Sequence, residues 1–245
     1  MLYTSKGIVI HHFKYNDKSV IAKIYTEKHG LQSFIINGVR SKKSKNKAAL
    51  LQPLSLVEVN AYKKENKGLQ QLKEIKSAYS FQELPFHIYK TSIAFFIAEV
   101  LYKSIKEEEK NESLFDFLYG GIQLLDLQTE HYVNFHLLFL ARFTKHLGFY
   151  PQNRVMSSDN SSIIYFDIQE GAFTNLLPIH QFYIEGSLSN QLRILFGMNF
   201  DKMGEIDFDN STRKLVLNAI LNYYRFHLSN FEQLKSKEVL EEILN

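Results

Sequence analysis

The sequence contains no cysteine among its 245 residues. This absence excludes disulfide bonds, thiolate metal sites and cysteine nucleophiles, and it suits a protein of the reducing cytoplasm. No apolar run approaches the roughly 20 residues that a membrane-spanning helix needs. The first residues also lack the basic start, apolar core and cleavage site of a signal peptide. The sequence therefore predicts a cytoplasmic protein.

Familiar catalytic motifs are missing as well. The sequence has no Walker-type glycine loop, no G-x-S-x-G and no H-E-x-x-H. The nine histidines are scattered. His11 and His12 are adjacent in a predicted strand and so point to opposite faces, and the spacing of His131 and His136 does not suit one helical face. We therefore expect a protein that is not an enzyme and that needs neither a metal nor a cofactor.

Positive charge is concentrated in the first third of the chain. Residues 1–80 hold 15 cations and 5 acids, a formal net charge of +10, whereas the remaining 165 residues hold 14 cations and 21 acids, or −7. A basic segment joined to a mildly acidic remainder indicates two separate roles, with polyanion contact in the first part. The alternative is a surface that is simply rich in lysine.

One short segment carries much of that charge. Five cations and no acid lie between residues 40 and 47, and they are Arg40, Lys42, Lys43, Lys45 and Lys47. The segment separates two predicted strands, so we expect an exposed loop. So many like charges repel one another unless a polyanion relieves them. The segment therefore predicts contact with the nucleic-acid backbone, and the alternative is a solvated loop.

Five strands are predicted before residue 80. β-Branched and apolar residues bounded by turn residues predict strands at residues 5–13, 19–26, 31–36, 54–62 and 69–80. Leu72 and Ile75 in the last strand depart from strict alternation, and a β-bulge would bring both inside. Five short strands with a long loop between the third and fourth fit a Greek-key barrel of the OB type. An SH3-like barrel also fits this pattern.

Helical periodicity begins after Pro85. Apolar spacing predicts helices at residues 86–106, 114–127, 131–147, 188–196, 211–228 and 237–244, and a small hairpin at 163–166 and 171–173. The predicted fold is α+β with an OB-type barrel domain at 1–80. A helical bundle domain at 81–150 and 178–245 follows, with a small hairpin insertion at 151–177.

Several sequence stretches resemble the RecO family of bacterial recombination mediators. They are KGIVI at residues 6–10, IYTEKHG at 24–30, GVRSKKS at 38–44, LQP at 51–53, LGF at 147–149 followed by Pro151, and LKS at 234–236. Their order and spacing are more specific than any one of them. The resemblance extends over most of the chain.

The resemblance implies an OB domain, a helical domain and a small C-terminal region. It implies a protein that binds single- and double-stranded DNA and anneals complementary strands. With its partner RecR, such a protein helps load RecA onto gaps coated by the single-stranded-DNA-binding protein SSB during DNA recombination and repair. The resemblance implies no catalytic residue, and it implies association with the nucleoid.

The chain departs from the family in one region. Many members hold zinc with four cysteines after the L-G-Y/F motif, where this chain has none between residues 152 and 177. A thiolate zinc ribbon is therefore impossible here. We expect the hairpin to persist without metal, held by Ile163, Tyr165, Phe173 and Leu176.

Two sets of residues are candidates for binding. Lys6, Lys14 and Lys23 could extend the DNA surface, while Tyr25, Phe34 and Tyr62 could stack on bases. For these aromatics the alternative is a place in the barrel core. Arg142, Lys145 and His146 could form a basic rim beside an apolar groove that receives an acidic, hydrophobic tail such as the C-terminus of SSB. The alternative is ordinary helix packing with charged ends reaching solvent.

Two other functions remain open from the sequence. A protein–protein adaptor would not need residues 40–47 to bind oligonucleotides. A nuclease built from carboxylates of the acidic two-thirds would cleave strands with Mg²⁺ or Mn²⁺ and would stop with EDTA.

Overall fold

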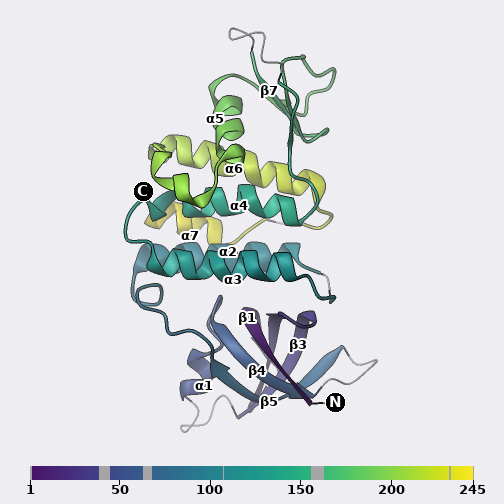
Figure 1. Ribbon diagram of the computed structural model, residues 1–245, viewed down its shortest axis with the longest axis vertical. Coiled ribbons are helices and arrows are strands. Elements are labelled where there is room, and N and C mark those ends of the chain that lie inside the picture. The colour runs from purple at the N-terminus through teal and green to yellow at the C-terminus, as the bar shows by residue number, and fades with distance from the viewer. Residues whose placement is uncertain are drawn as a thin grey trace. The chain divides into compact units, whose positions relative to one another are not determined.

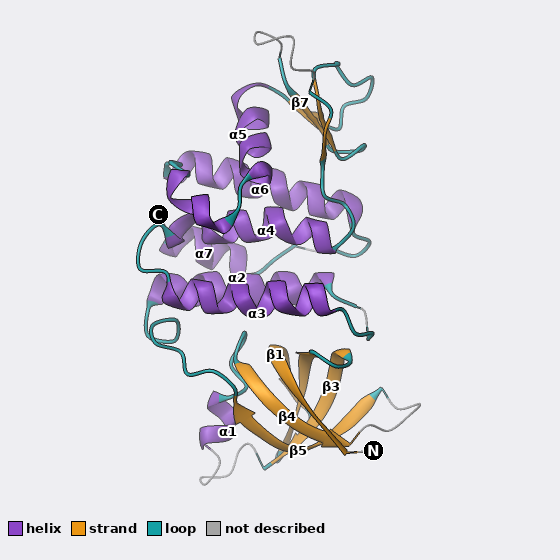
Figure 2. Cartoon of the chain, viewed as in Figure 1, coloured by secondary structure: helices purple, strands orange, loops and turns teal. Residues whose placement is uncertain are grey.

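The computed structural model describes residues 2–38, 45–62, 68–106, 108–155, 163–231 and 233–244, without the side chains of residues 45 and 46. The strands are β1 (Leu2–Lys14), β2 (Ser19–Thr26), β3 (Gly30–Asn37), β4 (Leu56–Tyr62), β5 (Leu69–Ser77), β6 (Gln152–Asn153), β7 (Tyr165–Asp167), β8 (Ala172–Thr174) and β9 (Tyr183–Ile184). The helices are α1 (Lys45–Ala49), α2 (Ile88–Ser104), α3 (Glu112–Leu127), α4 (Phe135–His146), α5 (Gly186–Gly197), α6 (Asn210–His227) and α7 (Ser236–Ile243), with 3₁₀ turns η2 (Tyr132–Asn134) and η3 (Phe200–Glu205). Figure 2 distinguishes the helices from the strands.

The N-terminal strands close into a barrel. Their order is β1-β2-β3-β5-β4, with β3 parallel to β5 and β1 antiparallel to β4. Figure 1 shows these strands curling around a common core, with α1 beside them. Apolar side chains that alternate along the strands, among them Val9, Ile24, Phe34 and Val59, fill the interior. The closed five-stranded order is that of an OB-type barrel, which confirms this part of the predicted fold.

Local irregularities in the barrel have physical causes. Between β4 and β5, Asn60 pairs with Glu74 and Ala61 pairs with Leu72, so one extra residue bulges from β5. The predicted bulge is confirmed, and it turns both Leu72 and Ile75 toward the core. At Gly7 of β1, a Cβ atom would lie 2.6 Å from Ile24 Cγ2, so strand β1 requires glycine at this close approach.

The chain forms two compact units, Met1–Leu127 with Leu234–Ile243, and Gln128–Gln233 with Leu244–Asn245. The first unit contains the barrel, α2, α3 and α7. The second contains α4, α5, α6 and the small sheet. This grouping differs from the predicted domain boundaries, because α2, α3 and α7 group with the barrel rather than with the other helices.

A buried carboxylate holds the segment that follows the barrel. Asp126, at the end of α3, is fully buried and accepts hydrogen bonds from the backbone N–H groups of residues 82, 83 and 84, at 2.7 to 3.2 Å. The Tyr79 hydroxyl donates another hydrogen bond to it, at 3.0 Å. Lys90 is also fully buried, and it donates to the Asp126 carbonyl oxygen at 2.8 Å and pairs with Glu83. This polar network fixes residues 79–84 to α2 and α3.

The C-terminal helix α7 belongs to the first unit. Glu99 of α2 accepts hydrogen bonds from the backbone N–H groups of Lys235 and Ser236, at 3.0 and 2.8 Å, and from the Ser236 hydroxyl. A carboxylate at a helix N-terminus satisfies donors that have no partner within the helix. The LKS stretch is thus the place where α7 attaches to α2.

The second unit is built around α4 and α6. Phe135, Phe139 and Phe143 of α4 are fully buried, and the Tyr224 hydroxyl of α6 donates to the Leu140 carbonyl at 2.8 Å. The predicted helix at 131–147 begins later, at Phe135, because His131 has a φ of 59° and a 3₁₀ turn follows it. Gly148 has a φ of 84° after α4, a conformation that favours glycine at the end of a helix.

The predicted hairpin is present as β7 and β8, and β6 and β9 extend it to a four-stranded sheet in the order β6-β8-β7-β9. The set of residues expected to hold it was partly wrong. Tyr165 and Phe173 are buried, but Ile163 is 57% exposed and Leu176 is 74% exposed. Phe166 and Phe196 replace them in the core, because the sheet packs against α5 and α6. Sequence alternation could not reveal those later helices as neighbours.

Within the described part of the chain, no helix is long and apolar enough to cross a membrane. The same residues contain no group of three or more histidine, aspartate or glutamate side chains placed to hold a metal ion.

Candidate nucleic-acid interface

The basic segment joins β3 to β4. Arg40, Lys42 and Lys43 lie outside the described residues, as does the side chain of Lys45. Lys47 is exposed on α1, a short helix where the sequence had predicted only loop. A cation in the last turn of a helix interacts favourably with the helix dipole. Leu51, which is 1% exposed, anchors the end of this segment in the barrel core.

Lys6 and Lys23 lie on the paired strands β1 and β2. The Lys6 ammonium lies 5.5 Å from the ring centroid of Tyr119 on α3, and the Lys23 ammonium lies 5.5 Å from that of Tyr102 on α2. These are cation–π distances. Both ammonium groups therefore face aromatic rings of the helices in the first unit, and their contact with DNA stays a prediction. Lys14 is exposed and pairs with Asp17 at 3.1 Å.

Two of the three predicted stacking aromatics are buried. Tyr25 and Phe34 are both 0% exposed, so their assignment as base-stacking platforms was wrong. Phe34 points into the barrel core, and the Tyr25 ring stacks on Phe115 of α3 with centroids 6.4 Å apart. Tyr62, at the end of β4, is 41% exposed and remains available for stacking.

The end of β1 and the turn that leads to β2 present aromatics that the sequence interpretation missed. Phe13, in β1, is 41% exposed and Tyr15, in the turn, is 55% exposed. The exposed cation Lys14 lies between them in sequence, and exposed Lys18 follows Tyr15 by three positions. OB folds use the loop between their first two strands to bind nucleic acid. The signal was present as aromatic residues on either side of Lys14, but only Lys14 was named as a candidate.

The predicted basic rim lies at the end of α4. The Arg142 guanidinium lies over the Tyr150 ring at 5.9 Å from its centroid, Lys145 is exposed, and His146 is half-buried. Burial and the positive charges of Lys145 and Arg142 lower the pKa of His146, so it is neutral at physiological pH.

Tyr150 also lines a pocket of about 500 Å³ in the second unit. Its apolar wall includes Phe173, Ile194, Phe196 and Met198, and its charged residues are Arg193, Lys202 and Glu205. Arg142 approaches this pocket only through Tyr150 and is not among the residues that line it, so its predicted place beside an apolar groove stays a prediction. Lys145 and His146 are not among the residues that line the pocket either.

Comparison with known proteins identifies the family. The model of the family "Recombination protein O N terminal" matches residues 1–81, and that of "Recombination protein O C terminal" matches residues 85–238. The chain is 38% identical to the DNA repair protein RecO of Phocaeicola vulgatus over 245 residues and 39% identical to that of Bacteroides fragilis over 246 residues. It is 36% identical to the Flavobacterium psychrophilum protein of the same name over 247 residues, and each of the three comparisons covers 100% of both chains. The chain therefore belongs to the RecO family of DNA repair proteins.

Proposed function

We propose that this protein is a non-catalytic recombination mediator. It binds single- and double-stranded DNA through the basic barrel, anneals complementary strands, and with RecR helps load RecA onto gaps coated by SSB. It acts in the cytoplasm, at the nucleoid. Membership in the RecO family supports the role in DNA repair and recombination, and the basic OB-type barrel supports the contact with DNA.

The observation that carries the proposal is the charge of the barrel. Residues 1–80, which form the OB-type barrel and the first residues after it, carry a formal net charge of +10. Within this segment, Lys47 on α1 is exposed. Lysine and arginine that neutralise phosphates release counterions, and this gives affinity with little dependence on sequence. Neutralising the phosphates of two strands also lowers their mutual repulsion, which favours annealing.

Fluorescence anisotropy with a labelled single DNA strand, measured at several salt concentrations, tests whether the basic segment contacts phosphates. A variant with Arg40, Lys42, Lys43 and Lys45 changed to alanine should bind more weakly. The slope of log affinity against log salt should flatten by about 0.7 for each lost single-strand phosphate contact.

The matched control changes four exposed cations of the acidic remainder, Lys110, Arg154, Arg225 and Lys235, to alanine. It removes the same charge, so it separates a local contact from an effect of net charge. If both variants bind as the wild type does, the DNA surface lies elsewhere. If the wild type itself does not bind, the adaptor function takes precedence. Strand cleavage that needs Mg²⁺ and stops with EDTA would favour the nuclease instead.

We also propose that the pocket beside Arg142 receives the acidic tail of SSB. The cation–π contact of Arg142 with Tyr150 and the lining cations Arg193 and Lys202 support this proposal. Arg142→Glu should weaken binding to full-length SSB about tenfold or more and should not change the weak binding to SSB without its C-terminal tail. Arg154→Glu, at an exposed site that does not line the pocket, is the control.

A further inference from the structure

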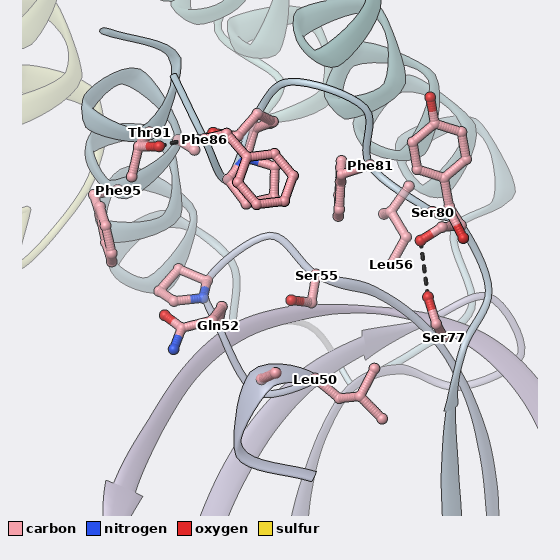
Figure 3. Close-up of a pocket in the computed structure, with 16 residues that line it drawn as sticks. Leu50, Gln52, Ser55, Leu56, Ser77, Ser80, Phe81, Phe86, Thr91 and Phe95 are labelled. Carbon is pink, nitrogen blue, oxygen red and sulfur yellow. Dashed lines mark hydrogen bonds between the residues drawn. The ribbon is translucent and has the colours of Figure 1, made fainter. Parts of the chain in front are cut away.

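A second pocket, in the first unit, has no role in the contacts described so far. Its volume is about 480 Å³. It is lined by Ala49, Leu50, Gln52, Pro53, Ser55 and Leu56 before and at the start of β4, and by residues that follow β5 or belong to α2, chiefly Phe81, Phe86 and Phe95. Figure 3 shows Phe86 and Phe81 on one side of this space and Gln52, Ser55 and Leu50 on the other.

Aromatic side chains of this pocket are open to solvent. Phe86 is 84% exposed and Phe95 is 46% exposed. An exposed aromatic group next to a concave apolar wall often marks a binding site, since single exposed apolar residues need no partner but contiguous ones do. A flat, apolar group can therefore enter the space and contact these rings without unfolding any element.

The pocket adjoins the basic helix α1. Exposed Lys47 precedes the lining residues Ala49 and Leu50 by two and three positions. The LQP stretch continues the same wall, with Gln52 and Pro53 in the lining and Leu51 in the barrel core. A polyanion held at α1 would thus have an apolar recess immediately beside it.

The polar groups in the pocket are uncharged. The Thr91 hydroxyl donates to the Leu84 carbonyl at 2.7 Å, and the Ser77 hydroxyl donates to the Tyr79 carbonyl at 2.8 Å, so both are already satisfied. Gln52 is exposed, and its side-chain amide offers both a donor and an acceptor. None of the described lining residues is charged.

We propose that this pocket takes unstacked bases of a single nucleic-acid strand whose phosphates contact α1. A nucleotide separates its charged phosphate from its apolar, flat base, which matches a basic helix beside an uncharged aromatic pocket. A carboxylate of an acidic peptide inside the same pocket would be desolvated without a cation to pair with it. The inference rests on the proposed DNA binding and gives that binding a second component, base stacking, which does not depend on charge.

The test compares two probes with the same number of phosphates. One is a labelled oligothymidylate, and the other is a labelled strand of equal length made of abasic sites. The wild-type protein should bind oligothymidylate more tightly than the abasic strand. The double variant Phe86→Ala with Phe95→Ala should lose about fivefold or more in affinity for oligothymidylate. It should bind the abasic strand as the wild type does and show an unchanged salt slope.

Controls separate stacking from folding. Ile88→Ala changes a 64% exposed residue of α2 that does not line the pocket, and it should leave both affinities unchanged. Phe86→Tyr with Phe95→Tyr keeps the aromatic faces and should retain tight binding. Thermal melting, monitored by circular dichroism, checks that each variant folds as the wild type does.

Each contrary result identifies what has failed. If the wild type binds both probes equally and the double variant matches it, the base pocket is wrong but the proposed DNA binding stands. If the wild type binds neither probe, the proposed function fails and the base pocket fails with it. If the double variant loses binding only to a labelled aspartate-rich peptide ending in phenylalanine, the pocket is a peptide site and the proposal is overturned.

Discussion

At the scale of single residues, buried ionisable groups make stability depend on pH. His136 of α4 is 1% exposed, and its burial, together with repulsion from the Arg213 cation, lowers its pKa to about 3. The unfolded chain takes up this proton near pH 6.5. The stability contributed by neutral His136 is therefore fully present above pH 6.5 and is lost as the pH falls from 6.5 toward 3.

We predict that His136→Gln weakens this dependence, because glutamine does not titrate. Between pH 7 and pH 5, the free energy of unfolding of the wild type should fall by about 2 kcal/mol more than that of the variant. Urea unfolding at the two pH values measures the difference. Equal falls in the two proteins would contradict the assignment of this proton uptake to His136.

Asp126 shows the opposite case, a carboxylate that is stabilised as an anion. Burial alone would raise its pKa, but the hydrogen bonds from the N–H groups of residues 82, 84 and 83 and from the Tyr79 hydroxyl lower it. Its contribution to stability is present above the unfolded pKa of about 3.9 and is lost as the pH falls through the lower folded pKa.

Asp126→Ala should destabilise the first unit by about 3 kcal/mol or more, since it removes a charged acceptor from buried backbone donors. Chemical denaturation at neutral pH measures this loss. Asp116→Ala, at an exposed position of the same helix, should change stability by less than about 0.5 kcal/mol. A comparable loss in both variants would mean that the effect comes from helix α3 in general.

At the scale of elements, the small sheet has an aromatic core. The Phe166 and Phe173 rings stack with centroids 4.5 Å apart, and the Tyr223 ring of α6 lies 5.0 Å from that of Phe166. The Tyr223 hydroxyl also donates to the Phe149 carbonyl at 2.5 Å. Aromatic pairs of this kind add stabilisation beyond the area that they bury.

We predict that Phe173→Ala lowers stability by about 3 to 5 kcal/mol, as is usual for a buried phenylalanine. EDTA should leave the melting temperature of the wild type unchanged, because the chain has no cysteine to supply thiolate ligands. Differential scanning calorimetry measures both effects. Phe182→Ala, which changes a ring that is 44% exposed, is the control, and a melting temperature that falls with EDTA would show that a metal holds the sheet.

Hydrophobic periodicity predicted most elements because each strand or helix repeats its own pattern. It identified the barrel strands, the bulge in β5 beside Leu72, and helix α6. It missed α1, because five residues among lysines carry almost no periodic signal. It also misassigned Tyr25 and Phe34, since alternation shows which residues share a face but not what covers that face.

At the scale of the whole molecule, the first unit is not continuous in sequence. Helix α7 completes it from the other end of the chain, with Leu240 buried and Glu99 accepting hydrogen bonds at the N-terminus of α7. The unit therefore depends on a segment that is more than a hundred residues away from α3 in the sequence.

We predict that replacing residues 128–233 with a flexible linker of about 16 residues, which spans about 22 Å, leaves a folded barrel with α2, α3 and α7. Residues 1–127 alone should be less stable by about 2 kcal/mol or more, because they expose the surface that Leu240 covers. Thermal and urea unfolding compare the two proteins. Equal stability would show that α7 does not support the first unit.

The sequence by itself determined the barrel, the helices α2 to α7, the absence of a thiolate metal site and the concentration of positive charge in the first third. These follow from composition and local periodicity, which need no knowledge of distant neighbours. The tertiary structure alone decided that Tyr25 and Phe34 are buried, that Asp126 and Glu99 are occupied by backbone donors, and that Phe86 and Phe95 line an open pocket beside α1. Burial and pocket formation depend on which elements meet in space, and local sequence patterns do not encode that.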